Sequence, residues 1–540
     1  MMKRKLINSL FFLFPFMAMA QDKGLDEKVN DAFMPFAVWW ESTVLTSVPI
    51  AGHDIPIVLL LLIAGATFFT IAFKFPNIRL FPLAINTVRG KYDELEGAAG
   101  HGVEPSEINV VDGDIPDTIR DESQEGEVSH FQALATAVSG TVGLGNIAGV
   151  AVAIAIGGPG ATFWMIVCGL IGMSSKFVEC TLGVKYRDVD ANGTVYGGPM
   201  YYLKRGLQER NMGGLGKVLA VIFAILCVGA SFGGGNAFQS NQAAVQISSM
   251  TGLEGGATGL IIGVVLAVLV GIVIIGGIKK IASVTEKIVP FMAVIYVIAS
   301  LIIIFANIKY IGDAISMIFS GALSLEAGIG GVIGVIIVGF QRAAFSNEAG
   351  AGSAAIAHSA VKTKYPASEG VVALMEPFID TVVVCTMTAL VIIFFNMDAG
   401  AFDYGSTQGS TVLINETQQY IGGVDLTSMA YDSVIPGFRY VLTVAIILFA
   451  FSTMISWSYY GLQSWKFLFG RGRKADIAYK VLFLLFVVIG AAATLDAVIK
   501  FSDAMILALV FPNMIGLLLL FPKVREELNN YLSAIKGMKS

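Results

Sequence analysis

Hydroxyl and glycine residues interrupt one long uncharged stretch of the sequence. From Phe131 to Ser175 the chain has no Asp, Glu, Lys or Arg, yet residues Ser139–Asn146 contain three glycines, one serine and one threonine. Glycines this dense weaken a helix, whereas a single Gly-x-x-Gly pair would serve close packing between helices. The cluster is denser than packing needs, so we interpret it as a break in a membrane helix.

Such a break could bind ions of both signs. The half-helix that starts after it exposes free amide groups and the positive end of its dipole, which attract a carboxylate. The unwound segment before it turns carbonyl oxygens outward, and these suit a small cation such as Na⁺. We therefore predict a substrate carboxylate on the amides of Leu144 and Gly145, beside Thr141, with a cation on the preceding carbonyls.

A second glycine-rich run lies roughly 190 residues later, at Ala327–Gly334. Paired glycine interruptions at matching places in two halves of a chain are the best pointer in a sequence to a transporter site. We expect this run to be the second break and place Gly331 in the substrate site. Each break opens a block of five hydrophobic segments, and an odd number makes the two blocks enter the membrane from opposite sides. The sequence therefore predicts a five-plus-five inverted repeat.

The elements that carry these breaks must be membrane helices. Hydrophobic residues make up 55% of the 540 positions and charged residues only 14%, and the mean hydropathy is +0.74. A helical span needs about 20 apolar residues, and the strand-like alternation that a barrel needs is not found in these runs. We predict an all-α polytopic membrane protein with eleven transmembrane helices. These segments are approximately 55–73, 131–156, 161–184, 218–237, 257–277, 288–306, 322–345, 370–395, 440–460, 478–494 and 504–521.

The N-terminus predicts the orientation of the chain. Basic residues at positions 3–5, the apolar run Leu6–Met19 and the small residues Ala18 and Ala20 are typical of a signal peptide; an uncleaved signal anchor is the alternative. The mature N-terminus would then lie outside, and eleven crossings place the C-terminus inside. Most Lys and Arg residues fall in the loops that this topology assigns to the cytoplasm, as expected for an inner cell membrane protein. The opposite side has only Lys23, Lys28, Lys309, Arg439 and Lys500.

The predicted organisation follows from these segments. Residues 90–129 contain twelve acidic and two basic residues, which favours a solvated loop over a packed unit. From the N-terminus, we expect a signal peptide at 1–20, a periplasmic segment at 21–54, an extra first transmembrane helix at 55–75, a cytoplasmic acidic loop at 76–129, a first five-helix repeat at 130–306, a second at 307–521 and a cytoplasmic tail at 522–540.

Four longer strings carry a family resemblance. They are Gly140–Val150, Gly197–Tyr202, Phe345–Ser353 and Phe378–Thr381. Together they resemble the alanine/glycine:cation symporter family, also called sodium:alanine symporters, over about Phe131–Phe521. The resemblance implies a leucine-transporter-type fold and sodium-coupled symport of small neutral amino acids, alanine and glycine, by alternating access. The signal peptide and the acidic loop are not part of the family pattern.

The resemblance also implies roles for single residues. It places the hydroxyls of Ser452 and Thr453 beside the carbonyls of Ser139 and Val142 as a sodium site. The alternative is that these hydroxyls bond back to their own helix.

Three further residues complete the predicted sites. Trp457 shares a helix face with Thr453, and we expect both to border the substrate, with the indole leaving room for alanine or glycine only. Gln239 belongs to an Asn-x-x-Gln-x-Asn pattern of the family and is a further substrate candidate; capping of its helix is the alternative. Asn146 could bind a second cation beside the substrate carboxylate.

Four ionisable residues lie at predicted membrane depth. Glu376 and Asp380 are spaced i,i+4, and Arg342 and Glu348 lie near the inner end of the preceding segment. Such groups are costly in a membrane and are usually paired or functional. We interpret the four residues as an inner gate or a structural ion-pair network, with a substrate site as the alternative.

Other classes of function lack their parts. The sequence has no His-Glu-x-x-His and no phosphate-binding loop, and its four histidines are scattered, so neither an enzyme nor an ATP-driven pump is expected. An ion channel would need a pore motif or repeated charge rings. Proton-coupled amino-acid symport stays open as the alternative. We expect an amino acid, Na⁺ and the lipid bilayer as partners and no nucleic acid or organic cofactor; the exact substrate, the stoichiometry and the oligomeric state are not predicted.

Overall fold

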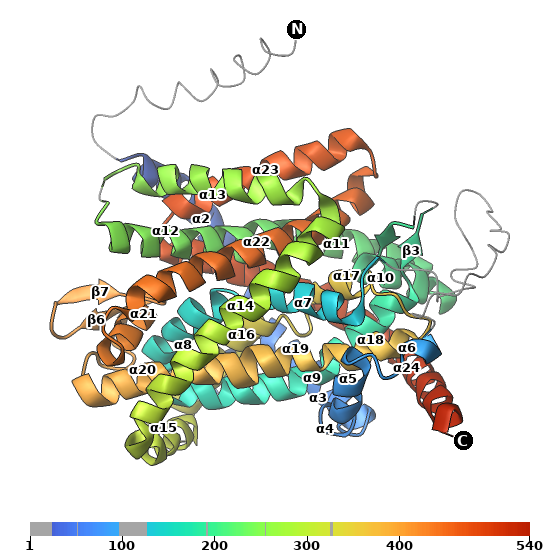
Figure 1. The fold of residues 1–540 in the computed structure, drawn as a ribbon, viewed down its shortest axis with the longest axis horizontal. Helices are drawn as coiled ribbons and strands as arrows, with labels where there is room; N and C mark the ends of the chain where they lie inside the picture. Colours follow the sequence, from blue (N-terminus) through green and yellow to red (C-terminus); the bar gives the residue numbers. More distant parts are fainter. Residues whose placement is uncertain are drawn as a thin grey trace, which may run out of the picture.

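The computed structural model describes residues 24–50, 52–96, 127–190, 193–253, 255–323 and 328–539. The predicted signal peptide at 1–20 and most of the predicted acidic loop lie outside the described residues. The long helices run side by side across Figure 1. In that view the β6–β7 hairpin lies at the left-hand end, while α10, α6 and the C-terminus lie toward the right-hand end.

Short and long helices alternate along the chain. The elements before the acidic loop are α2 (Leu25–Val44), β1 (Ser47–Ile50), β2 (His53–Pro56), α3 (Ile57–Ala72), α4 (Pro76–Arg79), α5 (Phe81–Val88) and α6 (Asp93–Glu96). The next are α7 (His130–Thr141), α8 (Val150–Gly157), α9 (Gly160–Lys185), β3 (Asp188–Val189), β4 (Val195–Tyr196), α10 (Pro199–Glu209), α11 (Gly213–Phe232), α12 (Phe238–Thr251), α13 (Thr258–Ile274) and α14 (Gly277–Ala306).

The second half of the chain begins with α15 and ends with the longest described helix. Its elements are α15 (Ile311–Leu323), α16 (Gly328–Asn347), α17 (Ala354–His358), α18 (Pro366–Ala373), α19 (Met375–Pro377), α20 (Thr386–Ala399), β5 (Thr407–Gln408), β6 (Thr411–Ile414), β7 (Gln419–Ile421), α21 (Gly423–Val434), α22 (Phe438–Phe469), α23 (Arg473–Ala492) and α24 (Leu495–Lys539). Short π-helical turns join several of these helices, at Gly145–Gly149, Gly233–Ala237 and Phe378–Cys385. The strands form only small antiparallel sheets, β1-β2, β3-β4 and β5-β6-β7.

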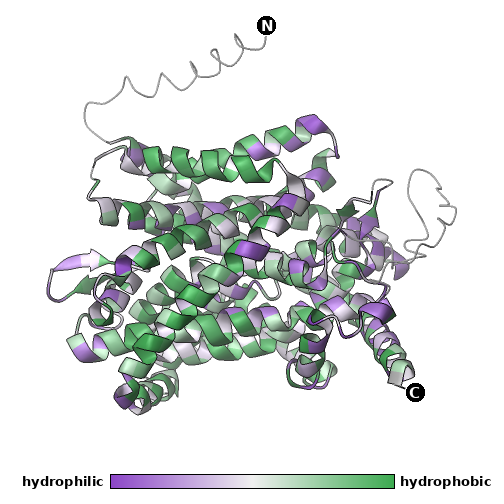
Figure 2. Cartoon of the chain, viewed as in Figure 1, coloured by the Kyte–Doolittle hydropathy of each residue, from purple (hydrophilic) through white to green (hydrophobic). Residues whose placement is uncertain are grey.

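Several of the described helices could cross a membrane. Seven are long and apolar enough by themselves, and the bent pair α7 and α8 would make an eighth. Three shorter apolar helices lie at Ile57–Ala72, Thr258–Ile274 and Gly331–Asn347. Each predicted segment overlaps one of these helices, and Figure 2 shows hydrophobic residues along most of their length. The predicted class, a helical membrane protein, is confirmed, whereas the number of eleven crossings stays a prediction.

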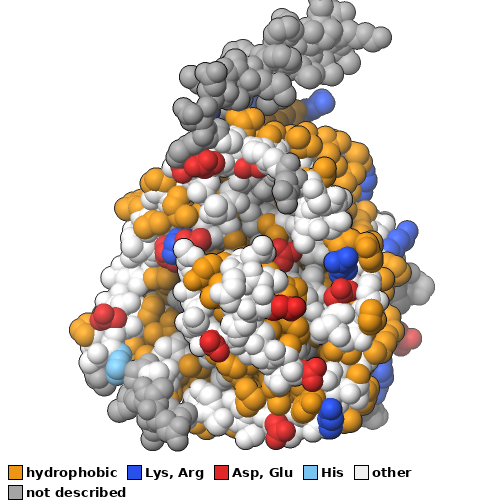
Figure 3. All heavy atoms as spheres, turned by 90° about the vertical axis from the view of Figure 1, so that its left-hand side faces the viewer, with side chains coloured by type: hydrophobic (Ala, Val, Ile, Leu, Met, Phe, Trp, Pro, Cys, Tyr) orange, Lys and Arg blue, Asp and Glu red, His pale blue; other side chains and the backbone are white. Residues whose placement is uncertain are grey.

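Charged side chains are present at one end of the helix bundle (Figure 3). Figure 3 looks onto the end that lies at the left of Figure 1, and Asp and Glu side chains are scattered there among uncharged atoms. Hydrophobic side chains gather toward the margins of this view. A lipid-facing belt around a polar end would have this distribution.

The first predicted break is confirmed. Helix α7 ends at Thr141, and Val142 leaves the helical conformation with ψ 83°. The chain resumes as a π-helical turn at Gly145 and continues into α8, whose axis is bent by 49° from that of α7. The dense glycines of this run thus end one helix and start another within the same span.

The predicted position of the second break is wrong. Helix α16 continues from Gly328 to Asn347, and the interruption follows at 348–353, before α17 begins. The backbone there takes positive φ values at Glu348 (55°), Gly350 (91°) and Gly352 (86°). Glycines lower helix stability but do not by themselves end a helix. Gly334, for example, is helical and has no atom within 4 Å of an added Cβ. Glycine density therefore marked the wrong end of the same helix.

The broken helices lie in the interior of the bundle. Helix α22 packs against α7, α11, α12 and α14, and α9 packs against α16, α17, α18 and α3. Helices α16 and α24 also contact each other. The two interruptions therefore face long helices that can hold fixed side chains against the exposed backbone.

Candidate functional site

Oxygen atoms of α22 meet the end of α7. The hydroxyl of Thr453 donates to the carbonyl oxygen of Ser139 across 3.0 Å. The Ser139 hydroxyl donates in turn to the carbonyl oxygen of Ser452 at 2.9 Å, and the hydroxyl of Ser456 donates to Ser139 Oγ at 3.0 Å. All four side chains are buried. The structure therefore brings together three of the predicted sodium residues and adds Ser456.

Only one of the two predicted hydroxyls on α22 faces the break. The Ser452 hydroxyl donates to the carbonyl of Phe449 at 3.0 Å, on its own helix, which is the alternative that the sequence left open. Ser456 takes its place because it lies one turn after Ser452 and on the same face as Thr453. The fourth predicted residue, Val142, is buried at the end of α7. The signal that could have found Ser456 is this i,i+3 spacing from Thr453.

The donor set around Ser139 fits a sodium ion. It consists of neutral carbonyl and hydroxyl oxygens, which are hard ligands of the kind that bind Na⁺ at unwound helices. These oxygens now satisfy one another, at 2.9 to 3.0 Å. A cation would therefore replace hydrogen bonds between groups that are already close together.

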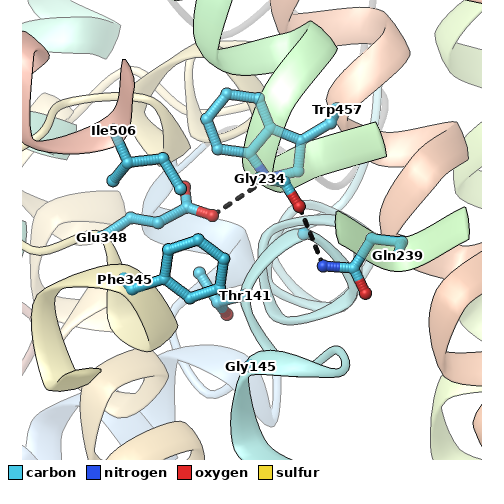
Figure 4. Close-up of a pocket in the computed structure, with 9 residues that line it drawn as sticks. Thr141, Gly145, Gly234, Gln239, Phe345, Glu348, Trp457 and Ile506 are labelled. Atoms are coloured by element: carbon cyan, nitrogen blue, oxygen red, sulfur yellow. Dashed lines mark hydrogen bonds between the residues drawn. The ribbon is translucent and has the colours of Figure 1, made fainter. Parts of the chain in front are cut away.

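A small cavity lies beside these oxygens, between the two interruptions (Figure 4). Its volume is only ≈ 10 Å³, about what one water molecule needs. An amino acid would therefore need the lining side chains to move. The lining residues are Gly140, Thr141, Gly145, Gly234, Gln239, Phe345, Glu348, Trp457 and Ile506.

The cavity gathers most of the predicted substrate residues. Thr141, Gly145, Gln239 and Trp457 line it. Thr453 lies one turn before Trp457 on the same helix. Leu144 adjoins the cavity through its amide, as described next. Gly331 lies in the first turn of α16 and is not among the lining residues.

Gln239 already uses the amide that was predicted to hold a carboxylate. Its Oε1 accepts a hydrogen bond from Leu144 N at 3.0 Å, while its Nε2 donates to the carbonyl of Gly234 at 2.9 Å. The neighbouring Gly143 amide donates to Asn146 Oδ1 at 2.9 Å. A substrate carboxylate on Leu144 would thus have to displace the side-chain oxygen of Gln239.

Two glycines allow α22 to approach this closely. A Cβ at Gly143 would lie 2.4 Å from Thr453 Oγ1, and a Cβ at Gly235 would lie 2.1 Å from Trp457 Cγ. Neither position has room for a larger residue without a shift of α22. The triple glycine at 233–235 was a signal in the sequence for Gly234 in the cavity wall, whereas nothing in the sequence pointed to Ile506.

A buried carboxylate links the two interruptions. Asn146 Nδ2 donates to Asp380 Oδ1 at 2.7 Å and to its backbone oxygen at 3.0 Å. Asp380 Oδ2 accepts from Ser346 Oγ at 2.8 Å and from Thr381 Oγ1 at 2.6 Å. Ser346 is on α16 and Asn146 lies just after the first break. These oxygens could bind a second cation where Asn146 was expected to do so.

The four predicted gate residues do not form one cluster. Arg342 pairs with Asp503 of α24 and stands one turn before Phe345 of the cavity wall. Glu348 lines the cavity itself. Glu376 pairs with Lys176, and Asp380 bonds to Asn146 as described. The break at 348–353 puts Arg342 and Glu376 on opposite sides of it. The role of the four residues as an inner gate or a structural ion-pair network stays a prediction.

A chain of alternating charges leads away from the cavity. Lys176 Nζ lies 3.1 Å from Glu376 Oε1, and His358 Nε2 lies 3.4 Å from Glu376 Oε2. The other ring nitrogen of His358 contacts Glu369. Glu369 also contacts His130, whose second nitrogen lies 2.6 Å from Glu96.

Each histidine of this chain stands between two carboxylates. Both ring nitrogens of His130 hydrogen-bond to carboxylates, and both can donate only in the protonated imidazolium, so this geometry fits a buried cation at His130. The chain joins α9, α19, α17, α18, α7 and α6. Sequence reasoning missed it because the two histidines are far apart in the chain and have no motif spacing.

Comparisons with known proteins identify the family. The profile described as "Sodium:alanine symporter family" matches residues 108–540. The sodium/alanine symporter AgcS of Methanococcus maripaludis is 40% identical over 473 residues, covering 87% of this chain and 93% of AgcS. The amino-acid carrier protein AlsT of Bacillus subtilis is 35% identical, covering 74% of this chain and 80% of AlsT.

A solved structure is more distantly similar. The crystal structure of MhsT in complex with L-phenylalanine has a TM-score of 0.49 and 15% identity, covering 74% of this chain and 99% of MhsT. The leucine-transporter-type arrangement and the inverted repeat therefore stay predictions. The family resemblance of the sequence strings is confirmed by the profile match over most of the chain. This protein belongs to the sodium:alanine symporter family and is a membrane amino-acid symporter.

Proposed function

We propose that this protein takes up alanine and glycine together with Na⁺. The observation that carries the proposal is the meeting of Ser139, at the first break, with Thr453 and Ser456 of α22, beside a cavity lined by Trp457. Sodium would bind these oxygens, with Val142 and Ser452 supplying carbonyl oxygens. The substrate would lie between Thr141, Gly145 and Gln239.

The size of the cavity supports a small substrate. Trp457 is 1% exposed and its indole packs against Gly235, where a Cβ would meet it at 2.1 Å. Phe345 and Ile506 fill the remaining wall. A pocket walled by such bulky groups excludes added bulk by steric overlap once it has opened for a small substrate, whereas a missing methylene costs only about 1 to 3 kcal/mol. Glycine would therefore bind somewhat more weakly than alanine, and leucine would be rejected.

Alternating access would use ionic contacts on the two sides of the cavity. The Arg342–Asp503 pair holds α16 to α24 on one side, and the chain from Lys176 to Glu96 holds the inner helices on the other. Opening one set while the other stays closed would expose the cavity to one side at a time. By the topology inferred from Lys and Arg placement, the mature N-terminus lies outside the inner membrane and the C-terminus inside.

Proton coupling is the alternative, and one observation favours it. Asp380 is fully buried, and within the described part of the chain its carboxylate accepts side-chain hydrogen bonds from the neutral donors Asn146, Ser346 and Thr381. A carboxylate in such a place could take up either a proton or a second cation.

The entry of one sodium ion supplies enough free energy for concentrative uptake, because about 100 mV supplies roughly 2.3 kcal/mol and a tenfold gradient adds about 1.4 kcal/mol.

Uptake into proteoliposomes tests the proposal. Labelled alanine and glycine are offered with an imposed Na⁺, Li⁺ or H⁺ gradient, with and without a membrane potential. We expect concentrative alanine uptake only with the Na⁺ gradient. Uptake driven by the H⁺ gradient without sodium would favour the alternative, and equilibration without accumulation would contradict symport.

A further inference from the structure

Glu348 brings a carboxylate into the wall of the cavity. It is the first residue after α16, at the second break, and is only 2% exposed. Its Oε1 accepts a hydrogen bond from Trp457 Nε1 at 2.9 Å, and its Oε2 accepts one from the hydroxyl of Ser353 (Figure 4). Both donors are neutral, and a carboxylate can accept about four hydrogen bonds. The group therefore has capacity for a further donor.

No Lys or Arg of the described residues forms a salt bridge with this carboxylate. Lys176 instead pairs with Glu376 at 3.1 Å, and Arg342 pairs with Asp503. Burying a carboxylate without a paired cation is costly. Ionisable groups that a protein keeps at membrane depth are therefore functional candidates, and they need a partner.

The backbone conformation of Glu348 also indicates a functional role. Its φ is 55°, a left-handed conformation that glycine adopts freely and that a residue with a long side chain rarely adopts. Such a conformation is strained for this residue type and clusters at functional sites. Gly350 and Gly352 in the same break have positive φ without this strain. A glutamate at 348 thus places its carboxylate in the cavity at the expense of backbone strain.

We propose that Glu348 binds the α-ammonium group of the substrate. The proposal rests on the proposed function, and it deepens it by defining the substrate class as zwitterionic amino acids with a free ammonium group. The ammonium would take the place of the Trp457 indole N–H on Glu348 Oε1. The indole N–H is a neutral donor, whereas the ammonium would bring a positive charge to a buried carboxylate that has no paired cation, and this favours the exchange.

The opposite wall of the cavity completes the recognition of a zwitterion. The amide of Leu144 and the side chain of Gln239 lie on one side, and Glu348 lies on the other, with Thr141 between them (Figure 4). A carboxylate and an ammonium on adjacent atoms of one small molecule could reach both. When the ammonium replaces the indole N–H, the Trp457 side chain would move away from Glu348. This movement would enlarge the cavity, whose volume is ≈ 10 Å³.

Binding measurements with analogues test the proposal. Alanine, lactate and N-acetylalanine compete with labelled alanine for the purified wild-type protein, in Na⁺ buffer, and for Glu348→Gln. We expect lactate and N-acetylalanine to bind the wild type at least about 100-fold more weakly than alanine. In Glu348→Gln, alanine affinity should fall at least about tenfold, equal to about 1.4 kcal/mol, and the preference over lactate should fall by the same factor.

The matched control is Glu527→Gln, which removes another buried carboxylate that does not line the cavity and that pairs with Lys185. It should keep the wild-type preference for alanine over lactate. A variant Glu348→Asp, with the charge retained, should keep more of the preference than Glu348→Gln. Thermal unfolding with and without Na⁺ shows whether each variant is folded.

Two results would overturn the proposal. One is a folded Glu348→Gln that still prefers alanine over lactate as strongly as the wild type does. The other is a wild type that binds lactate within tenfold of alanine, which decides the matter even if neither variant folds. Failure of the wild type to accumulate alanine with Na⁺ would instead contradict the proposed function, so the two failures are distinguishable.

Discussion

The hydroxyl of Thr453 donates to the carbonyl oxygen of Ser139 across 3.0 Å, although the two residues are 314 positions apart. This contact ties α22 to the last turn of α7, where the helix stops. Ser456 adds a second tie to Ser139 at 3.0 Å. Helix α22 therefore supplies its hydroxyls at the point where α7 ends.

Removal of single hydroxyls should change the sodium requirement in a defined order. Thr453→Ala and Ser456→Ala should each raise the Na⁺ concentration for half-maximal alanine uptake, by roughly tenfold if one ligand is worth about 1 to 1.5 kcal/mol. Ser452→Ala should have a smaller effect, because its hydroxyl bonds to Phe449 of its own helix. Uptake at varied Na⁺ gives the answer. An unchanged sodium dependence in both Thr453→Ala and Ser456→Ala would place the ion elsewhere.

Shortening Trp457 should widen the range of substrates. In Trp457→Leu the indole is removed from the cavity wall and a smaller side chain takes its place, which enlarges the cavity. Valine and leucine should then become competitors, while alanine binds more weakly. Trp39→Leu, on the exposed face of α2 where the indole is 57% exposed, is the matched control and should keep the wild-type ranking. Competition against labelled alanine measures both. A Trp457 variant with the original size ranking would contradict the pocket assignment.

Adding one methyl group at the first break should abolish transport. In Gly143→Ala the new Cβ would lie 2.4 Å from Thr453 Oγ1 and 3.1 Å from Gln239 Oε1, so α22 or the break must shift. Overpacking of this kind costs about 1 to 3 kcal/mol. Gly149→Ala lies in the same π-helical turn region with nothing within 4 Å of its Cβ and should transport normally. Equal uptake by the two variants would show that the contact between α22 and the break does not matter.

Loss of one histidine from the charge chain should destabilise the fold. His358→Ala leaves Glu369 and Glu376 facing each other without the ring between them. Breaking a buried ion pair by removing one partner costs about 3 to 5 kcal/mol. We expect a clear fall in the thermal unfolding temperature in detergent, whereas His53→Ala, in the β1-β2 hairpin, should change it little. A His358 variant as stable as the wild type would mean that the ring does not hold these carboxylates.

The sequence was sufficient for features that are encoded locally. Uncharged apolar runs predict membrane helices, and the glycines from Gly140 to Gly145 predict the first break because they lie together in one span. The position of Thr453 and Trp457 on one helix face predicts that both approach that break. The family strings added Gln239, which contacts Leu144 as a wall residue of the cavity.

The missed features depend on contacts between distant segments. The second break is set by positive φ values at Glu348, Gly350 and Gly352, and a string of glycines elsewhere on α16 is not evidence of them. Ile506 enters the cavity because α24 packs against α16. The partners of His130 and His358 come from other helices, so their role cannot be read from spacing in the chain.

Helix α24 connects two contacts that lie far apart in the protein. Near one end, Asp503 holds Arg342 beside the cavity; near the other, Tyr531 donates to Glu96 at 2.9 Å. Tyr531 follows Asp503 by 28 positions, which span about 42 Å at roughly 1.5 Å per residue. Pro512 and Pro522 lie between these contacts and are places where a helix bends. Because α24 can bend at both prolines, a displacement at one of these contacts need not be carried rigidly to the other.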